Sequence, residues 1–348
     1  MTETTRAAVI HAAHDLRIEP FAVPETGPHD VRVRVLAGGI CGSDLHYFNH
    51  GGFGTVRVRE PMVLGHEVAG VVEAVGSAVT RVRQGDKVAV NPSLPCGHCR
   101  FCLMGMANHC LDMRFYGSAM RFPHVQGGFR DTLVCDESQA IPADMPAERA
   151  AFAEPLSVCL HAARQAGNLL GARVLVTGAG PIGALCAMAA RHGGAREIVA
   201  TDLMDAPLAV MRRVAADHTL NLRTNPDALA PYAAEKGAFD VVFECSGSGA
   251  ALAGALPVAR PGAVIVQVGL GGGEASVPLN MLVAKEISLR GTFRFHEEFA
   301  LAVDVLARGA MDVSPLLTET LPLAEAERAF RLASDRTQAM KVQIAFSG

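Results

Sequence analysis

The sequence predicts an α/β protein that joins a β-rich domain to a second domain with a doubly wound parallel sheet. Up to about residue 150, short valine-rich runs such as DVRVRVLAGG at 30–39 and EVAGVVEAVG at 67–76 are separated by glycine and proline, which is typical of short strands in a barrel-like fold. Beyond residue 150, alanine-rich helical stretches alternate with short apolar strands, the pattern of βαβ units. A length of 348 residues also exceeds one ordinary domain.

We therefore divide the chain into three parts. Residues 1–150 are expected to form the β-rich domain, 151–292 the parallel-sheet domain, and 293–348 a tail that returns to the first domain. The tail holds a helical stretch, HEEFALAVDVLARG, and ends in the strand-like run MKVQIAF. The strands of the parallel sheet are predicted at 173–178, 197–202, 239–247, 263–269 and 287–293.

Composition and charge exclude several classes of function. Half of the residues are hydrophobic and 19% are charged, as in a globular protein with a large core. The formal net charge is −4 and no run is rich in lysine or arginine, so neither nucleic acid nor an anionic membrane is expected as a partner. The longest uncharged run, at 174–190, is broken by glycine and proline and falls short of the ~20 residues of a membrane span.

The cysteine count and the N-terminus bear on location. The first residues lack a basic segment followed by an apolar one, so we find no export signal. Nine cysteines are an odd number, which argues against a framework of disulfides. Both observations favour a reducing compartment, and the cytoplasm is the expected location.

Four cysteines within PCGHCRFCLMGMANHC at 95–110 have the spacing C-x2-C-x2-C-x7-C. Cysteines joined by tight turns can place four thiolates around Zn²⁺, and a complete tetrahedron leaves no position open for a substrate. Disulfides fit poorly with a reducing compartment, while an iron–sulfur cluster is another use of such a run. The sequence therefore predicts a structural zinc site at Cys96, Cys99, Cys102 and Cys110.

The two histidines inside the lobe and the four cysteines scattered elsewhere are not expected to bind a metal. His98 and His109 lie inside the lobe, but they are surplus to four thiolates, and we expect both on the surface. Four further cysteines are scattered through apolar stretches and are expected to be small core residues: Cys135, Cys159, Cys186 and Cys245.

A second group of metal-capable residues is spread along the chain. Cys41 stands between glycines in GGICGSDLHY, His66 and Glu67 follow a glycine in VLGHEVAG, and Glu154 is a lone carboxylate in AFAEPLSV. A catalytic zinc keeps three protein ligands and one exchangeable position. Cys41, His66 and Glu154 are a plausible set, with Glu67 as a competing or alternating ligand. Each could alone be an ordinary polar residue, and the set gains weight from the nucleotide motif that accompanies it.

That motif is G-x-G-x-x-G within VLVTGAGPIGALC, between a predicted strand and an alanine-rich helix. In this context it is the fingerprint of a dinucleotide-binding turn. Gly178 would allow the tight turn, and Gly180 would let the backbone approach the pyrophosphate at the helix N-terminus. The cofactor-binding residues expected in this turn are Gly178, Gly180, Pro181, Ile182 and Gly183.

The next predicted strand ends in Asp202, 19 residues after Gly183. A carboxylate at this position hydrogen-bonds the ribose 2′-hydroxyl and repels a 2′-phosphate, so NAD is favoured over NADP. The glycine-rich stretch VGLGGG at 268–273 is expected to form a loop beside the nicotinamide, with Gly269 as its cofactor contact.

These residues together resemble the zinc-dependent medium-chain dehydrogenases along essentially the whole chain. CGSDLHY, GHE, the four-cysteine lobe, AEPL and G-x-G-x-x-G occur in the order of that family, and FRF at 293–295 is similar to its polyol branch. The resemblance implies a GroES-like catalytic domain with two zinc ions per subunit, one catalytic and one structural. It further implies a Rossmann domain for NAD(P), a C-terminal return, and a substrate bound between the domains.

The resemblance also implies roles for individual residues. Ser43 matches the hydroxyl that hydrogen-bonds the reacting oxygen, and His46 matches the relay that carries the proton to solvent. Tyr47 is expected to line the substrate pocket. Arginine binds a carboxylate through two hydrogen bonds, so the candidates for holding a sugar acid are Arg114, Arg121 and Arg294.

Residues 112–129 and the run NPSLPCGHC are similar to members of the branch that oxidise a sugar acid. The expected activity is NAD(P)-dependent oxidation of L-idonate at its 5-hydroxyl to 5-dehydro-D-gluconate, with sorbitol or xylitol as alternative substrates. A zinc- and nucleotide-binding protein without catalysis is the alternative from another class. The resemblance implies a homodimer or homotetramer, paired through a strand such as ISLRGTF.

Overall fold

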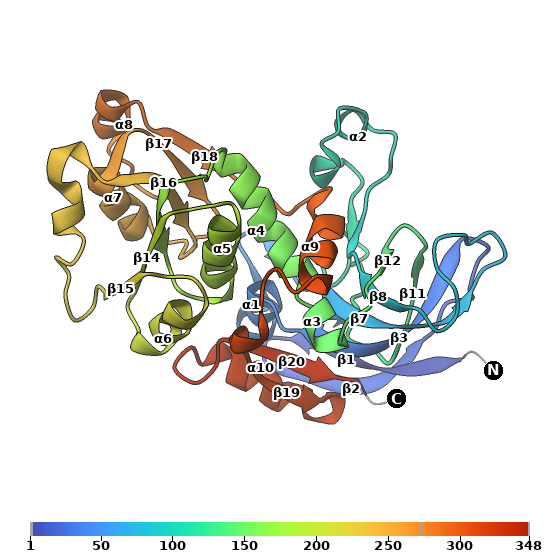
Figure 1. The fold of residues 1–348 in the computed structure, drawn as a ribbon. Coiled ribbons are helices and arrows are strands. Elements are labelled where there is room, and N and C mark those ends of the chain that lie inside the picture. The colour runs from blue at the N-terminus through green and yellow to red at the C-terminus, as the bar shows by residue number, and fades with distance from the viewer. Residues whose placement is uncertain (1–2, 272, 347–348) are drawn as a thin grey trace.

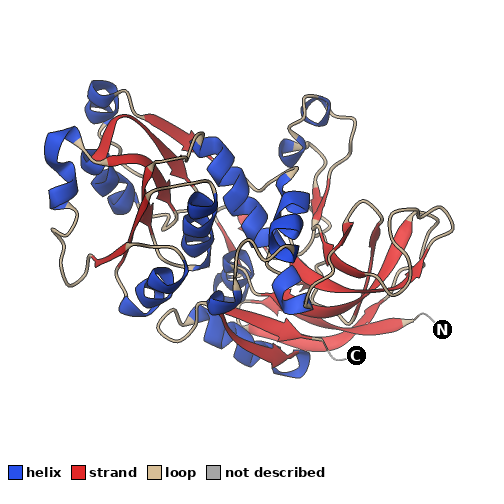
Figure 2. Cartoon of the chain, viewed as in Figure 1, coloured by secondary structure: helices blue, strands red, loops and turns tan. Residues whose placement is uncertain are grey.

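The computed structural model describes residues 3–271 and 273–346 and has two lobes, one built of strands and one of helices on a parallel sheet (Figures 1 and 2). Helix α4 (Ala153–Ala166) runs between the lobes, and one hydrophobic core continues from strands of the first lobe, past α4, into the parallel sheet. The glycine-rich stretch at 268–273 contains residue 272, which lies outside the described residues.

The β-rich lobe contains, within the described residues, a seven-stranded sheet and a three-stranded sheet. Strand β3 (Asp30–Gly39) lies inside the larger sheet, and its alternate valines are fully buried because side chains of a strand point to opposite faces in turn. The other strands of the larger sheet are β7 (Glu67–Val75), β8 (Lys87–Val90), β11 (Thr132–Asp136), β12 (Ala140–Pro142), β19 (Leu317–Pro322) and β20 (Lys341–Ala345). The smaller sheet consists of β1 (Thr4–Ala12), β2 (Asp15–Ala22) and β6 (Met62–Val63).

The first 150 residues are not all β, and the segment after β3 is the main difference from the sequence prediction. Helix α1 (Gly42–His50) begins at Cys41, whose backbone N–H donates to Asp44 Oδ2 at 3.0 Å, and it ends at Gly51 in the left-handed conformation. Both are known helix-end signals, a capping box and a glycine C-cap. Both signals lie between two longer strand patterns, at 30–39 and 67–76, which dominate the sequence-based prediction for this part of the chain. Two further helices of four residues interrupt this part: α2 (Arg100–Leu103) and α3 (Ala147–Ala150).

The second lobe confirms the predicted α/β fold class. Its six described strands are all parallel, and the strand order reverses between β13 (Arg173–Thr177) and β16 (Phe239–Glu244). In β13, Val174 and Val176 belong to the core that includes α4, whereas Leu175 belongs to the core on the opposite face. Both faces are covered, which explains why these strands read as continuous apolar runs. The remaining elements are α5 (Pro181–His192), β14 (Glu197–Asp202), α6 (Asp205–Val214), β15 (His218–Asn221), α7 (Gly249–Val258), β17 (Ala259–Gln267), α8 (Leu279–Lys285) and β18 (Ser288–Gly291).

The C-terminal segment crosses back to the β-rich lobe. Helix α9 (Glu298–Ala307) packs against α4, and strand β20 then pairs with β3 and β19. In α10 (Ala326–Ser334), Phe330 is fully buried, with its ring centre 5.2 Å from that of Phe48 on α1 and 6.3 Å from that of Phe129. The domain boundaries at residues 150 and 292 stay a prediction. Within the described residues, no helix combines the length and apolar character needed to cross a bilayer.

We expect Phe330→Ala to lower the free energy of unfolding by about 3–5 kcal/mol, because truncating a fully buried ring leaves a cavity between α10 and α1. Denaturant unfolding followed by circular dichroism measures the change. Phe122→Ala is the control, since that ring is 57% exposed, and its effect should stay within ~1 kcal/mol. Equal losses in the two variants would contradict the role of Phe330 in docking the C-terminal segment.

Candidate active site

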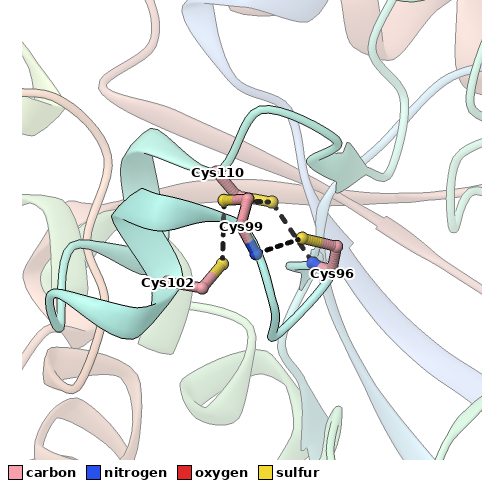
Figure 3. Close-up of side chains that lie close together, drawn as sticks. All are labelled: Cys96, Cys99, Cys102 and Cys110. Carbon is pink, nitrogen blue, oxygen red and sulfur yellow. Dashed lines mark hydrogen bonds between the residues drawn. The ribbon is translucent and has the colours of Figure 1, made fainter.

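The four-cysteine lobe, residues 95–110, contains α2 and a short 3-10 helix, η1 (Ala107–His109), and it projects from the larger β-rich part of the molecule (Figures 1 and 3). Cys96 precedes α2, Cys99 is its N-cap, Cys102 lies in the helix, and Cys110 follows η1. All four sulfur atoms lie within 4.8 Å of one another. Cys99 Sγ is 3.5 Å from Cys102 Sγ and 4.0 Å from Cys110 Sγ.

These separations fit a metal and exclude a disulfide. A tetrahedral Zn²⁺ with Zn–S bonds of about 2.3 Å places its sulfurs about 3.8 Å apart, and a disulfide bond measures only about 2 Å. Backbone N–H groups also point at the sulfurs: Cys99 N donates to Cys96 Sγ at 3.3 Å, and Cys96 N donates to Cys110 Sγ at 3.2 Å. The backbone N–H of Cys102 lowers the pKa of the Cys99 thiol to about 6, whereas burial, and then the hydrogen bond with Cys99, raises that of Cys102 to about 12. A bound cation would favour the thiolate form of both.

The remaining cysteines and the lobe histidines stay outside this cluster. His98 and His109 are both exposed, and the ring of His109 stacks on Phe293 with centroids 5.8 Å apart. Of the four scattered cysteines, three are buried and one is half-buried, and all are free thiols: Cys135, Cys159, Cys186 and Cys245.

Three of the four residues considered for a second metal lie together. Cys41 at the N-cap of α1, His66 just before β7 and Glu67 at its first residue each offer one ligand atom, and these atoms all lie within 4.8 Å of one another. Glu154, in the first turn of α4, is buried beside this group and interacts electrostatically with all three, but it is not part of that closest set.

A buried ammonium group also belongs to this cluster. Lys341, the first residue of β20, donates to Glu67 Oε1 at 2.7 Å and to the carbonyl oxygen of Ile40 at 2.9 Å. Strands β7 and β20 flank β3, so the ion pair passes over Gly39 of β3. A β-carbon at Gly39 would lie 2.1 Å from Glu67 Oε2, so only glycine leaves room for the pair.

Without a metal, the cluster holds more acidic groups than one ammonium can compensate. Burial, and then Glu67, raises the pKa of the Cys41 thiol to about 11. Burial likewise raises the pKa of Glu154 to about 8, and the negative charge of Glu67 acts in the same direction. A divalent cation would relieve this excess, and a set of thiolate, imidazole and carboxylate suits zinc.

The carboxylate of Asp44 lies on the Nδ1 side of the His66 imidazole. This carboxylate is fully buried, accepts hydrogen bonds from Cys41 N at 3.0 Å and from Gly65 N at 3.2 Å, and lies 3.7 Å from His66 Nδ1. A carboxylate commonly faces one nitrogen of a metal-binding imidazole in this way and fixes the ring orientation. The other ring nitrogen is then available as a ligand.

The residues expected to handle the substrate proton follow Cys41 on α1. Ser43 is half-buried and His46 is exposed, three positions apart on the helix. Tyr47 is buried, and its hydroxyl accepts a hydrogen bond from Ala119 N at 3.0 Å. Partial desolvation, and then the neighbouring imidazole of His50, lowers the pKa of His46 below 6.5. The neutral imidazole, which can accept a proton, therefore predominates at neutral pH.

A cavity of about 350 Å³ lies between the cysteine lobe and the loop at 117–125. Phe115 lines this cavity and also contacts the metal cluster, since its ring centre is 5.5 Å from that of His66. The polar or charged residues in the lining include Asn108, Ser118, Arg121 and Arg294. The Phe115 ring therefore contacts both the cavity and the metal cluster.

The three candidate arginines differ in their surroundings. Arg294 lines the cavity with its guanidinium carbon 4.2 Å from the centre of the Phe115 ring. It forms no ion pair with a carboxylate among the described residues, and the carboxylate whose charge acts on it is that of Glu154 in the metal cluster. Burial lowers the pKa of Arg294 to about 10, so the group stays cationic at neutral pH. Arg121 lines the same cavity but pairs with Asp112 at 2.7 Å. Arg114 is exposed on β10 (Arg114–Phe115) and is not part of the cavity lining.

The glycine-rich turn lies between β13 and α5, where the strand order reverses. Gly178 has φ +88°, and a β-carbon there would lie 2.8 Å from the backbone nitrogen of Ser246. A β-carbon on Gly183 would lie 1.9 Å from the carbonyl oxygen of Gly178. A β-carbon on Gly180, in contrast, would have its nearest neighbouring atom 3.9 Å away, so the backbone of Gly180 is open to a ligand. Pro181 and Ile182, both half-buried, begin α5.

The next loops complete this edge of the sheet. Asp202, the last residue of β14, is buried and accepts a hydrogen bond from Ala179 N at 2.8 Å. Gly269 follows β17, and a β-carbon on it would lie 2.2 Å from the backbone nitrogen of Gly247, so the loops after β16 and β17 touch. The turn, the helix N-terminus and the buried carboxylate together fit a dinucleotide.

A buried carboxylate, Glu244, joins three of these loops. It is the last residue of β16 and accepts hydrogen bonds from Thr177 Oγ1 at 3.2 Å, Gly247 N at 3.0 Å and Gln267 Nε2 at 2.5 Å. Those partners belong to, or follow, three neighbouring parallel strands. Glu244 therefore fixes the loops at the edge where the glycine-rich turn lies.

Sequence reasoning missed Asp44, Glu244 and Lys341, which hold the groups that it did identify. A signal was present for each. Asp44 stands inside the CGSDLHY run, Glu244 follows three apolar residues in DVVFECSG, and Lys341 is the single charge in MKVQIAF. A charge in a buried strand needs a partner, because leaving it unpaired costs several kcal/mol.

Comparisons with known proteins agree with this geometry. Residues 27–146 match the family model of the alcohol dehydrogenase GroES-like domain, and residues 181–308 match that of zinc-binding dehydrogenases. The chain is 47% identical to L-idonate 5-dehydrogenase (NAD(P)(+)) of Escherichia coli K12, over 90% of this chain and 91% of that protein. It is 37% identical to sorbitol dehydrogenase of Arabidopsis thaliana, over 98% of this chain and 95% of that protein. The crystal structure of the E. coli K-12 L-idonate 5-dehydrogenase matches with a TM-score of 0.93 at 44% identity, and covers 99% of each chain.

We expect about two equivalents of zinc per chain, one in each cluster. Cys102→Ser should lose about one equivalent and lower the melting temperature, because the lobe loses its crosslink. Cys41→Ser should also lose about one equivalent but leave the melting temperature closer to wild type. Inductively coupled plasma mass spectrometry after dialysis measures the zinc content, with Cys135→Ser as the control that retains both ions. A Cys41→Ser protein that keeps both ions would contradict the second site.

Proposed function

This chain belongs to the zinc-dependent alcohol dehydrogenases of the medium-chain family, and on that premise we propose that it oxidises L-idonate at its 5-hydroxyl to 5-dehydro-D-gluconate with NAD(P). The observation that carries the choice of substrate is Arg294, a guanidinium without a carboxylate partner among the described residues, at a cavity beside the metal cluster. The 47% identity to an L-idonate 5-dehydrogenase supports the same choice.

We propose that Cys41, His66 and Glu154 hold the catalytic zinc, with Glu67 as the alternating ligand. Glu67 lies closest to the cysteine and the histidine, but its charge is already balanced by Lys341. Glu154 has a raised pKa, so it gains more from a nearby dication. When bound, zinc would supply Lewis acidity toward the substrate hydroxyl, and NAD(P) would supply the hydride acceptor.

The chain's own residues then orient the substrate and remove its proton. Ser43 is proposed to hydrogen-bond the reacting hydroxyl, and His46 to carry the proton onward to solvent from its exposed position. Phe115 shapes the apolar side of the cavity, and Arg294 is proposed to bind the carboxylate through paired hydrogen bonds. Tyr47 is buried outside the cavity lining, and it is proposed to shape the pocket through its hydrogen bond to Ala119 N in the loop at 117–125. Arg121 is a weaker candidate because Asp112 neutralises it, and Arg114 is weaker because it lies outside the cavity lining.

We propose that NAD(P) binds at Gly178, Gly180, Pro181, Ile182 and Gly183, with Gly269 near the nicotinamide. The buried carboxylate of Asp202 supports binding of the unphosphorylated ribose of NAD. All nine cysteines are free thiols, which supports a reducing location such as the cytoplasm.

We also propose a homodimer or homotetramer that pairs through β18. This strand is at the edge of the parallel sheet, and all four of its residues are exposed. The neighbouring helix α8 exposes Leu279 and Val283, which are 67% and 77% accessible. An exposed strand edge beside apolar side chains is suited to pairing with a second copy.

Substrate profiling tests the proposed reaction. The purified zinc-loaded protein is offered L-idonate, sorbitol and xylitol with NAD or NADP, and formation of reduced cofactor is followed by absorbance. We expect the highest kcat/KM for L-idonate. A higher value for sorbitol or xylitol would make it a polyol dehydrogenase, and binding of reduced cofactor without turnover of any substrate would favour a non-catalytic protein.

Arg294→Ala should raise the KM for L-idonate by at least about tenfold, because a charge-assisted bidentate contact to the carboxylate is lost. The KM for sorbitol, which has no carboxylate, should change by less than about threefold. Arg114→Ala is the matched control, and it should affect neither substrate. Equal effects of Arg294→Ala on both substrates would contradict carboxylate binding by this residue.

The pH dependence of kcat/KM tests His46. The lowered pKa means that the imidazole accepts a proton above its pKa and loses that ability as the pH falls through it, so activity should decline on the acid side with a midpoint below 6.5. His46→Gln should abolish this acid-side decline and lower kcat/KM at neutral pH by roughly 10²-fold. His50→Gln should keep activity and shift the midpoint upward, since it removes one cause of the lowered pKa. An unchanged acid-side decline in His46→Gln would contradict the relay.

A further inference from the structure

Asp202 has a cationic partner that comes from the other lobe. Arg336, in the segment between α10 and β20, donates from Nη2 to Asp202 Oδ2 at 2.7 Å. The carboxylate is only 4% exposed, whereas the arginine side chain is 52% exposed. The ion pair therefore places a solvent-accessible guanidinium directly beside the carboxylate that selects the ribose.

The same guanidinium also lies next to the glycine-rich turn. A β-carbon on Gly180 would have Arg336 Nη2 as its nearest neighbour, at 3.9 Å. Gly180 marks the open side of the turn, where the backbone can approach a pyrophosphate. Arg336 thus stands between the expected pyrophosphate and the expected adenosine ribose.

The carboxylate does not depend on Arg336 for its position. Asp202 Oδ2 accepts from Ala179 N at 2.8 Å, and Oδ1 accepts from Leu203 N at 2.7 Å and from Met204 N at 3.1 Å. Three backbone N–H groups would therefore still hold the side chain if the guanidinium were removed. A substitution of Arg336 tests its charge and its donors without displacing Asp202.

The basic residues that follow β14 in sequence lie elsewhere. Arg212 and Arg213 are in the last turn of α6, about 10 Å along the helix from its start, and Arg212 donates to Thr219 Oγ1. Among the described residues, Arg336 is the cation that pairs with Asp202. The charge at the ribose site is consequently set by a residue that is 134 positions away in the chain.

We propose that Arg336 is a specificity-determining residue of the cofactor site, which lets this enzyme accept NADP alongside NAD. An aspartate alone repels a 2′-phosphate, but a guanidinium at 2.7 Å offsets that charge, and its remaining N–H groups can bind phosphate oxygens. The inference rests on the proposed dinucleotide site, and it deepens that proposal by naming the residue that admits the phosphorylated cofactor.

Half-cofactor fragments test the inference without involving zinc, substrate or hydride transfer. The zinc-loaded protein is titrated by isothermal calorimetry with AMP and with adenosine 2′,5′-bisphosphate. In Arg336→Ala, the Kd for the bisphosphate should rise by at least about tenfold, because a charge-assisted contact to the phosphate is lost, while the Kd for AMP changes by less than about threefold. The ratio of kcat/KM with NADP to that with NAD should fall in parallel, and Arg336→Lys should restore part of it.

Arg331→Ala is the matched control. Arg331 is an exposed arginine on α10 that pairs with Glu327, so its loss changes the net charge equally but leaves the cofactor site intact. Both Kd values should stay at the wild-type level. If the wild-type protein binds AMP but Arg336→Ala leaves the ratio of the two Kd values unchanged, the inference is wrong while the dinucleotide site stands. If the wild-type protein binds neither fragment, the dinucleotide site and the inference are both wrong.

Discussion

The buried ion pair between Glu67 and Lys341 is the interaction on which the candidate active site depends. Lys341 Nζ lies 2.7 Å from Glu67 Oε1, and both residues are almost completely buried. Burying two charges is unfavourable unless they are paired with good geometry, so removing either partner would leave an uncompensated charge in the core. Because Lys341 begins the C-terminal strand β20, the pair ties that strand to the residue next to His66. The ammonium group that balances Glu67 therefore reaches the cluster only when the C-terminal segment has docked on the first lobe.

The cofactor edge is organised by carboxylates in a comparable way. Glu244 accepts hydrogen bonds from groups on or after β13, β16 and β17, and Asp202 accepts them from the glycine-rich turn and from the start of the next loop. Parallel strands end at one edge of a sheet, so a few buried acceptors can align several loops there. The proposed ribose selectivity arises at the same edge, where Arg336 of the C-terminal segment reaches Asp202. The C-terminal segment thus contributes a cation to each half of the site.

The two metal clusters differ in how much of the fold they need. The four cysteines of the lobe lie within residues 96–110, and tight turns with backbone N–H groups bring the sulfurs together locally. The other cluster draws Cys41, His66, Glu154 and Lys341 from four separate elements of the chain. A local site can be built from short turns, whereas a dispersed site requires sheet, helix and C-terminal strand to be in place. A closed local site suits a structural ion, and a dispersed one lies beside a cavity that can admit a substrate.

The sequence by itself determined the α/β class, five of the six described strands of the parallel sheet, the four-cysteine spacing and the glycine-rich turn, because each is a local pattern of a few residues. Strand β15 was not predicted, because its four residues, HTLN, contain no apolar run. It also identified Cys41, His66, Glu67 and Glu154 as a candidate set, through short runs around them. Only the tertiary structure decided that Glu67 is paired with Lys341 over Gly39, that Asp44 faces His66, and that Arg336 rather than Arg212 or Arg213 reaches Asp202. The helix after Cys41 was missed because its signals, one cap residue and one glycine, are weak beside two long strand patterns. Ion pairs between residues 134 and 274 positions apart depend on how strands and helices pack, and no periodicity in the chain encodes that distance.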